Sequence, residues 1–183
     1  MSLNALQEKI ADKTAKLAII GLGYVGLPVA CLFAEAGFDV IGVDIQAERV
    51  AQINAGLSPI EGDEPGLAEL LAAVIGAGRL RATTEYAALA ECDGLLICVE
   101  TPVDEQHIPR YAALQNALRA LGPVLKDGAL VIVESTIAPG TMARLVKPLL
   151  EETSGRRVNA GFYLGHCPER VMPWKLLANL RGV

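Results

Sequence analysis

Residues Lys16–Gly26 read KLAIIGLGYVG, an apolar run that passes directly into three glycines with GxGxxG spacing. The apolar run predicts a buried strand, and the next residues, Tyr24–Ala36, predict a helix because their apolar side chains repeat on one side. A lone GxGxxG motif is weak evidence, but between a strand and a helix it is the pattern that binds the diphosphate of a dinucleotide. The alternative is a tight strand-to-helix turn that holds no ligand.

Each glycine of this motif has a predicted task. Gly21 permits the sharp turn, Gly23 lets a pyrophosphate approach the backbone, and Gly26 lets the helix pack closely on the strand. The start of the helix then offers free N–H groups and the positive end of its dipole to the phosphates. The predicted cofactor-binding residues of this segment are Gly21, Gly23, Tyr24, Val25 and Gly26.

An acidic residue follows the second predicted strand, at the distance from the glycines that dinucleotide-binding proteins use for the ribose. A carboxylate at Asp44 would accept hydrogen bonds from the ribose hydroxyls and repel the 2′-phosphate of NADP, which favours NAD. Arg49 complicates the choice, because a nearby arginine can accommodate that phosphate. Asp44 could instead be the N-cap of the next helix, and Arg49 a solvated helix residue. We include both residues in the predicted NAD site.

Short apolar runs alternate with helical patterns along the rest of the chain. The predicted strands are Lys16–Ile20, Phe38–Val43, Leu80–Ala82, Leu95–Val99, Ala129–Val133 and Phe162–Gly165, and the predicted helices are Tyr24–Ala36, Gln46–Asn54, Gly66–Ile75, Thr84–Ala90, Arg110–Leu121, Thr141–Leu150 and Val171–Leu180. Strands without polar alternation imply burial on both faces, and their alternation with helices implies parallel βαβ units. We predict an α/β fold, a doubly wound six-stranded parallel sheet (Rossmann fold) with strand order 3-2-1-4-5-6.

The composition fits one domain and argues against several function classes. Hydrophobic residues make up 52% of the 183 residues, which is enough for a sheet covered on both faces. No apolar run approaches the roughly 20 residues of a membrane helix, so no membrane partner is expected. The net charge is -5 and no basic cluster is interleaved with aromatic residues, which argues against nucleic acid as a partner.

The N-terminal residues 1–15 are predicted to form a polar, helical leader, with Leu3, Leu6 and Ile10 near one face, ahead of a single domain at residues 16–183. No secretory signal is visible. The four cysteines form no CxxC pair, which indicates free thiols and a reducing, cytoplasmic location. No cluster of ligands has zinc spacing, so no metal is predicted.

Five short motifs follow one another along the chain. They are GLGYVGLP at Gly21–Pro28, SPI at Ser58–Ile60, CVETP at Cys98–Pro102, ESTIAPGT at Glu134–Thr141 and CPERVMP at Cys167–Pro173. Together they resemble the N-terminal NAD-binding domain of the UDP-glucose/GDP-mannose dehydrogenase family, the nucleotide-sugar 6-dehydrogenases. The last motif is most similar to the UDP-N-acetyl-D-mannosamine dehydrogenase branch, because the UDP-glucose branch typically carries an acid where this chain has Pro173.

The resemblance implies oxidation of the C6 alcohol of a UDP-sugar, in this branch UDP-N-acetylmannosamine, to the uronate with two NAD, in the service of polysaccharide biosynthesis. In the family a cysteine of a later glycine-rich segment captures the intermediate aldehyde, and a lysine assists. Neither segment occurs in these 183 residues. We therefore expect a domain fragment that binds NAD but does not complete the oxidation alone. The regions that form the family's homodimer are also absent.

Two alternatives remain open at this point. The chain could be a stand-alone NAD-binding module or a subunit that needs a partner chain, or it could belong to another type of Rossmann dehydrogenase. A short-chain dehydrogenase is disfavoured, because no tyrosine of the chain is followed by lysine at the Tyr-x-x-x-Lys offset.

The resemblance also assigns residues behind the fourth and fifth predicted strands. It puts Val99 and Thr101 near the nicotinamide side of NAD, where the alternative is a turn ended by Pro102. Ser135 and Thr136 fall at the same edge of the sheet, and Thr136 is expected to orient a water or stabilise charge during catalysis. The alternative role for Thr136 is a helix N-cap, for which Thr141 is better placed.

Glu169, behind the sixth predicted strand, matches the family's glutamate of aldehyde handling and thioester hydrolysis, and is expected to be a catalytic base acting through water. A salt bridge to Arg170 or a place at a helix start is the alternative. Arg170 and Val171 match positions that help to hold the substrate. Cys167 is not expected to be the nucleophile, because the family's reactive thiol lies elsewhere, and His166 is expected to be a packed or hydrogen-bonded residue.

Overall fold

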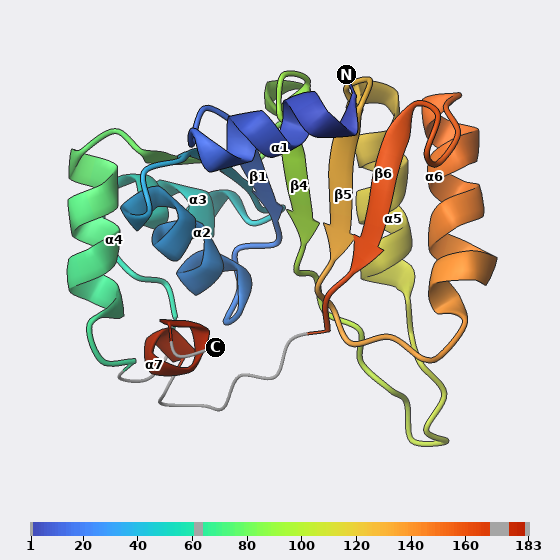
Figure 1. Ribbon diagram of the computed structural model, residues 1–183. Helices are drawn as coiled ribbons and strands as arrows, with labels where there is room; N and C mark the ends of the chain where they lie inside the picture. The colour runs from blue at the N-terminus through green and yellow to red at the C-terminus, as the bar shows by residue number, and fades with distance from the viewer. Residues whose placement is uncertain (1, 61–63, 169–175, 182–183) are drawn as a thin grey trace.

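A computed structural model describes residues 2–60, 64–168 and 176–181 of the chain, and Figure 1 shows a central sheet between two layers of helices. The strands are β1 (Lys16–Ile20), β2 (Asp39–Val43), β3 (Leu80–Thr83), β4 (Gly94–Ile97), β5 (Ala129–Val133) and β6 (Phe162–His166). All neighbouring strands are parallel, and their order is β3-β2-β1-β4-β5-β6. The predicted fold class and strand order are confirmed.

The helices connect the strands as crossovers. The α-helices are α1 (Leu3–Ala11), α2 (Gly26–Glu35), α3 (Ala47–Asn54), α4 (Leu67–Gly76), α5 (Ala112–Leu121), α6 (Lys147–Ser154) and α7 (Leu176–Arg181), and the shorter turns are η1 (Tyr86–Leu89), η2 (Gly122–Val124) and η3 (Met142–Val146). Among these described elements, no helix is both long and apolar enough to cross a membrane.

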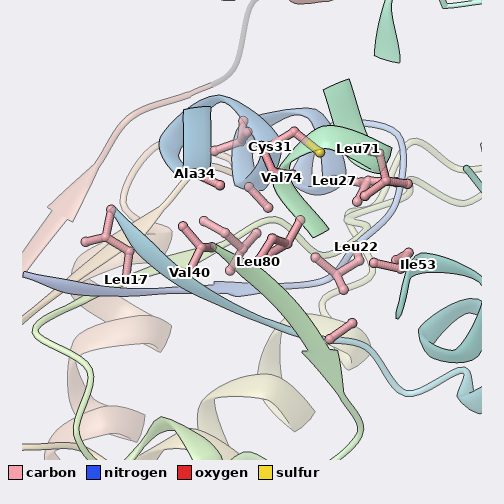
Figure 2. Packing of buried hydrophobic residues seen from close by; sticks show 14 of the residues in the cluster. Leu17, Leu22, Leu27, Cys31, Ala34, Val40, Ile53, Leu71, Val74 and Leu80 are labelled. Carbon is pink, nitrogen blue, oxygen red and sulfur yellow. The ribbon is translucent and has the colours of Figure 1, made fainter. Parts of the chain in front are cut away.

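The continuous apolar runs of the strands supply both faces of the sheet. In β1, Leu17 and Ile19 belong to one buried cluster, whereas Ala18 and Ile20 belong to the other, because successive side chains of a strand point to opposite faces. Figure 2 shows the first cluster between the sheet and the helices that cover it, with Leu27 and Cys31 from α2 and Leu71 and Val74 from α4. The opposite face is covered by α5 and α6.

The predicted strand Leu95–Val99 extends two residues too far, because β4 ends at Ile97. The carbonyl of Val99 accepts the hydroxyl of Ser135 at 2.6 Å instead of joining a strand ladder. Val99 therefore leaves the sheet, whereas the amide of Cys98 still donates to the Ile20 carbonyl of β1 at 2.8 Å. Both residues lie at the carboxyl edge, which is where parallel α/β sheets bind ligands.

The predicted helix Thr141–Leu150 is two elements, a π-helical turn, η3, followed by α6. Pro148 lies in the first turn of α6, where it has no N–H to bond the carbonyl four residues earlier, and the wider turn before it accommodates the missing bond. Thr141 precedes η3 but does not cap it with its side chain; its hydroxyl instead bonds the Tyr111 hydroxyl at 3.3 Å. Thr141 is thus the N-cap residue of this element, as predicted, but its hydroxyl makes no capping hydrogen bond.

The predicted helix Thr84–Ala90 forms only one 3₁₀ turn, η1. The Thr83 hydroxyl accepts a hydrogen bond from the amide of Glu85 at 3.1 Å, so it orders the entry to this turn. Of the last predicted helix, Val171–Leu180, the structure describes only α7, which begins at Leu176. The first residues of the predicted helix lie outside the described part of the chain. Arg181 of α7 pairs with Glu35 of α2 at 2.7 Å, which holds α7 on the α2 side of the sheet (Figure 1).

All four cysteines are free thiols, as predicted. Burial, followed by the charge of Glu35, raises the pKa of Cys31 to about 12, and burial raises the pKa of Cys92 to about 11. Both thiols therefore stay protonated and shielded at neutral pH. Cys167 is the exposed member of the set.

The N-terminal segment is an ordered helix that lies across the amino edge of the sheet (Figure 1). Ser2 begins α1 by accepting a hydrogen bond from the Ala5 amide at 3.3 Å. Leu6 is buried, but Leu3 and Ile10 remain 46% and 40% exposed. Only one of the three apolar residues predicted for one face of this helix is therefore part of the core.

A buried carboxylate ties α1 to the sheet. Asp93, whose side chain is 1% exposed, accepts hydrogen bonds from the amine of Lys9 at 3.0 Å, the amine of Lys126 at 2.9 Å and the amide of Lys16 at 3.1 Å. Burial by itself raises the pKa of Asp93, but the hydrogen bonds from Lys126, the Lys16 amide and Lys9 outweigh it, so the pKa lies below its ordinary value.

We predict that Asp93→Asn lowers the free energy of unfolding at neutral pH by about 2 kcal/mol, because the amide leaves two lysines without their anion. Since the pKa of Asp93 is lowered in the folded state, its contribution is present above the ordinary aspartate pKa and is lost as the pH falls through the folded value. Urea unfolding at neutral pH and at about pH 3 measures the free energy of unfolding of the unchanged chain and of Asp93→Asn. The difference between them should be smaller in acid.

The matched control for this prediction is Asp39→Asn. Asp39 pairs with Arg79 at 2.7 Å, but its side chain is 66% exposed, and exposed ion pairs contribute little. Equal destabilisation by the two substitutions, or a difference between the Asp93 proteins that does not shrink in acid, would contradict the role given to Asp93.

Candidate functional site

The glycine turn between β1 and α2 is sterically fixed at two of its three glycines. Gly21 has φ +91°, and a Cβ there would lie 2.7 Å from the carbonyl oxygen of Cys98. A Cβ on Gly26 would lie 1.9 Å from the carbonyl oxygen of Gly21. The turn therefore excludes side chains at both positions for reasons internal to the protein.

Gly23 is different, because a Cβ built on it meets no atom of the described protein within 4 Å. Its backbone also lies outside the positive-φ region that favours glycine. Neither packing nor conformation requires glycine here, so the exposed backbone is free for an external group to approach. The first turn of α2, preceded by Val25, has no side-chain cap among the described residues, and such helix starts attract phosphate.

Asp44 directly follows β2 and is only 5% exposed. Its Oδ2 accepts hydrogen bonds from the amide of Leu22 at 2.9 Å and from the guanidinium of Arg49 at 3.0 Å. Its Oδ1 accepts the amide of Gln46 at 2.9 Å. Gln46 rather than Asp44 is the N-cap residue of α3, so Asp44 steadies the helix start from two residues away and also ties it to the glycine turn.

These contacts leave the Asp44 carboxylate with acceptor capacity, since its two oxygens offer about four lone-pair positions and three are used. Arg49 is neither fully solvated nor unpaired: its side chain is 28% exposed and forms an ion pair with Asp44. An arginine already neutralised by this carboxylate has less charge to offer a 2′-phosphate. The pair therefore fits a ribose with free hydroxyls better than a phosphorylated one.

A second group of polar residues lies where β4 and β5 end. The Ser135 hydroxyl donates to the Val99 carbonyl at 2.6 Å, and the Thr101 hydroxyl donates to the Thr136 carbonyl at 2.7 Å. A ring nitrogen of His166, at the end of β6, lies 3.4 Å from the Ser135 carbonyl. His166 is thus hydrogen-bonded, and these bonds hold the three strand ends at one edge of the sheet.

Residues of both groups line one cleft with a volume of about 700 Å³, whereas His166 lies outside its lining. Ten of the predicted site residues line the cleft: Gly21, Gly23, Tyr24, Val25, Asp44, Arg49, Val99, Thr101, Ser135 and Thr136. Gly26 lies beneath the turn instead. The predicted residues Glu169, Arg170 and Val171 lie outside the described part of the chain.

Sequence reasoning missed one wall of this cleft, which α5 supplies with Ala113, Asn116, Ala117 and Ala120. Their spacing puts them on one helix face, so a signal was present, but three alanines do not distinguish a binding face from a packed one. Ile45, Gln46 and Tyr86 also line the cleft. Burial, and then the charge of Asp44, raises the pKa of Tyr86, which keeps its hydroxyl neutral.

Cys98 and Glu134 are two further lining residues that the sequence did not single out. The Cys98 thiol lies 3.1 Å from Oε2 of Glu134, to which it donates a hydrogen bond. Within the described part of the chain, no three histidine, cysteine or acidic residues are grouped so that they could hold a metal ion.

The cleft has the two features that the diphosphate and the ribose of a dinucleotide require. Gly23 leaves backbone open beside an uncapped helix start, and Asp44 keeps acceptor capacity one strand away. Diphosphate and ribose groups need these two features at the carboxyl edge of a parallel sheet.

Comparisons with known proteins agree with this geometry. Residues 15–182 match the family model described as "UDP-glucose/GDP-mannose dehydrogenase family, NAD binding domain". The chain is 41% identical over 165 residues to the UDP-N-acetyl-D-mannosamine dehydrogenase of Pyrococcus horikoshii, covering 90% of this chain and 38% of that protein. It is 40% identical over 158 residues to the GDP-mannose 6-dehydrogenase of Pseudomonas savastanoi, covering 84% of this chain and 36% of that protein.

Among solved structures, the fold matches that of the NDP-N-acetyl-D-galactosaminuronic acid dehydrogenase from Methanosarcina mazei with a TM-score of 0.88 and 37% identity. That match covers 98% of this chain and 40% of the other. The chain thus spans little more than a third of the length of the curated relatives it matches.

Proposed function

Because the chain belongs to the UDP-glucose/GDP-mannose dehydrogenase family and matches its NAD-binding domain, we propose that residues 16–183 hold NAD for the oxidation of a nucleotide sugar. NAD is the cofactor of this domain. Residues 1–15 are a leader in this proposal. The observation that carries it is the open backbone at Gly23, which the protein itself does not require to be glycine.

The reaction we propose is oxidation of the C6 alcohol of a UDP-sugar to the uronate, carried out by a protein of the relatives' length. UDP-N-acetylmannosamine is the proposed sugar, in keeping with the name of the Pyrococcus relative. The chain has a similar identity to a GDP-mannose 6-dehydrogenase. Assays should therefore compare UDP-N-acetylmannosamine with other nucleotide sugars. We further propose a homodimer of the longer protein and a cytoplasmic location, which the free thiols support.

In the proposed complex, the amides of the glycine turn and the start of α2 bind the pyrophosphate. Asp44 accepts the ribose hydroxyls, and Arg49 keeps the Asp44 carboxylate oriented through their 3.0 Å contact. Because Asp44 also holds the Leu22 amide, the ribose site and the phosphate turn are organised by one carboxylate. The turn is thereby shaped before the cofactor arrives, which lowers the cost of binding.

Val99, Thr101, Ser135 and Thr136 form the proposed nicotinamide side. NAD supplies hydride acceptance there, twice per sugar. The hydrogen bonds from Ser135 and Thr101 fix the loops behind β4 and β5, while the exposed Thr136 side chain is proposed to orient water or stabilise charge. Catalytic Glu169 and the substrate contacts Arg170 and Val171 are retained in the proposal on the family resemblance of their motif.

Titration of this 183-residue chain with NADH tests the cofactor site, and an assay for NADH formation with UDP-N-acetylmannosamine tests the division of labour. We expect a Kd on the order of micromolar and no oxidation of the sugar. A chain that does not bind NADH would contradict the proposed function. Turnover by this chain alone would instead refute the assignment of the oxidation to a longer protein.

A stand-alone NAD-binding module is the second candidate function, since the cleft and its glycine turn lie wholly within this chain. The two candidates separate when the chain is mixed with a polypeptide carrying the remaining part of a relative. Restored oxidation of the nucleotide sugar supports the dehydrogenase. If the chain binds NADH but the mixture does not oxidise the sugar, the module is favoured.

We predict that Asp44→Ala weakens NADH binding by about 1–3 kcal/mol, because the ribose hydroxyls and the Leu22 amide both lose their acceptor. Calorimetric titration measures this change, and Asp39→Ala is the control because Asp39 starts the same strand at its opposite, solvent-exposed end. An unchanged dissociation constant in Asp44→Ala would remove this residue from the site.

A further inference from the structure

Beside Asp44, the cleft has a side wall whose residues belong to neither the proposed phosphate site nor the proposed nicotinamide side. Turn η1, which carries Tyr86, contacts both β2 and α5. Turn η1 therefore lies between β2, which ends beside Asp44, and α5, whose Ala113, Asn116 and Ala117 line the same cleft. A group attached to a ribose held by Asp44, on the side away from the phosphates, extends along this wall.

The surface on that side suits a flat aromatic ring. Ile45 follows Asp44 directly, lines the cleft and is 86% exposed, an unusual state for an isoleucine. Ala117 and Ala120 of α5 line the same cleft without side chains that would fill it. A planar base placed here would cover the exposed isoleucine and rest on the short side chains of the helix.

Asn116 is the polar exception on this face of α5. It lines the cleft, it is exposed, and its side chain makes no hydrogen bond within the part of the chain that the structure describes. A carboxamide offers one acceptor oxygen and two donor hydrogens in one plane. These match the edge of adenine, which presents an amino donor beside a ring-nitrogen acceptor.

We propose that Asn116 determines the base selectivity of the cofactor site by recognising adenine. Its Oδ1 accepts a hydrogen bond from the adenine 6-amino group, and its Nδ2 donates to the neighbouring ring nitrogen. This inference rests on the proposed NAD site and adds to it the residue that reads the base. Asn116 acts on binding alone and takes no part in hydride transfer.

A base that carries a carbonyl oxygen in place of the 6-amino group provides the test. Hypoxanthine has nearly the same shape as adenine, but its 6-oxygen would face the Oδ1 of Asn116, acceptor against acceptor. The probes are therefore NADH and reduced nicotinamide hypoxanthine dinucleotide, and the readout is the ratio of their dissociation constants in a fluorescence titration. Three proteins are compared: the unchanged chain, Asn116→Ala and Gln115→Ala.

We expect the unchanged chain to bind NADH about tenfold more tightly than the hypoxanthine analogue, the size of a good paired contact to a base edge. In Asn116→Ala the preference should fall below about twofold, mainly through weaker binding of NADH. Gln115→Ala should keep the full preference, because Gln115 is on the same helix but does not line the cleft. Thermal unfolding of both variants checks that α5 is intact.

Two results would overturn the inference. The first is equal binding of both dinucleotides by the unchanged chain, which includes the case of an amide that rotates to suit either base. The second is a preference that persists in Asn116→Ala, which would place base recognition elsewhere. Failure of the unchanged chain to bind either dinucleotide is a different result, since it contradicts the proposed function from which the inference starts.

Discussion

Gly23→Ala is expected to bind NADH about 30-fold more weakly than the unchanged chain, a loss of about 2 kcal/mol, while remaining as stable. The added methyl group would meet no atom of the described protein within 4 Å, so folding does not oppose it. It would occupy the space through which a pyrophosphate approaches the backbone. Loss of binding without loss of stability is the signature of a position reserved for a ligand.

Calorimetric titration with NADH and urea unfolding of the same preparation measure the two halves of this prediction. The free energy of unfolding should stay constant or rise by less than about 1 kcal/mol, because alanine restricts the unfolded chain more than glycine does. Unchanged NADH affinity would remove the glycine turn from the phosphate site. Marked destabilisation would show that Gly23 serves the fold rather than the cofactor.

Gly26→Ala is expected to have the opposite profile, with a loss of about 3 kcal/mol or more of folding stability. Its Cβ would lie 1.9 Å from the Gly21 carbonyl oxygen and 3.1 Å from the Cβ of Cys98. The first clash is with backbone, which cannot rotate away as a flexible side chain can. Either α2 shifts off the sheet or the turn opens, and in both cases NADH binding is lost together with stability.

Gly76→Ala is the matched control, because Gly76 is the last residue of α4 and a Cβ there meets nothing within 4 Å. Alanine should stabilise this helical position by about 0.5–1 kcal/mol. In urea unfolding, the free energy of unfolding of the Gly26→Ala protein should then lie far below those of the Gly23→Ala and Gly76→Ala proteins. A Gly26→Ala protein as stable as the Gly76 variant would show that the close approach of α2 to the turn is not required.

The glycine spacing illustrates what can be predicted from sequence and what cannot. Turn geometry is local, so the motif predicted the special roles of Gly21 and Gly26, and the structure gives the steric reason for both. The ligand-related role of Gly23 and the other site assignments remain proposals for the experiments above. The position of Asp44 followed from the order of elements, but its hydrogen bonds to Leu22, Gln46 and Arg49 did not.

The errors of prediction share one cause. A proline inside a helical pattern disturbs the helix, but the pattern around Pro148 does not specify that the chain accommodates it through a π-helical turn, η3. Thr141 has a good capping residue type, but Tyr111, 30 positions away in sequence, takes its hydroxyl. Such competing partners come from distant segments, and residue type and spacing do not specify them.

The sequence by itself determined the strand and helix alternation, the parallel six-stranded sheet and its order, and the family to which the chain belongs. These follow from the apolar period, the glycine turn and motifs that are contiguous in the chain. Only the tertiary structure decided which residues form the walls of the cleft, which cation neutralises Asp44 and how α1 is fastened through Asp93. The physical reason is that patterning and turn chemistry act between near neighbours, whereas a binding surface is made by side chains that meet only after the sheet has brought separate segments together.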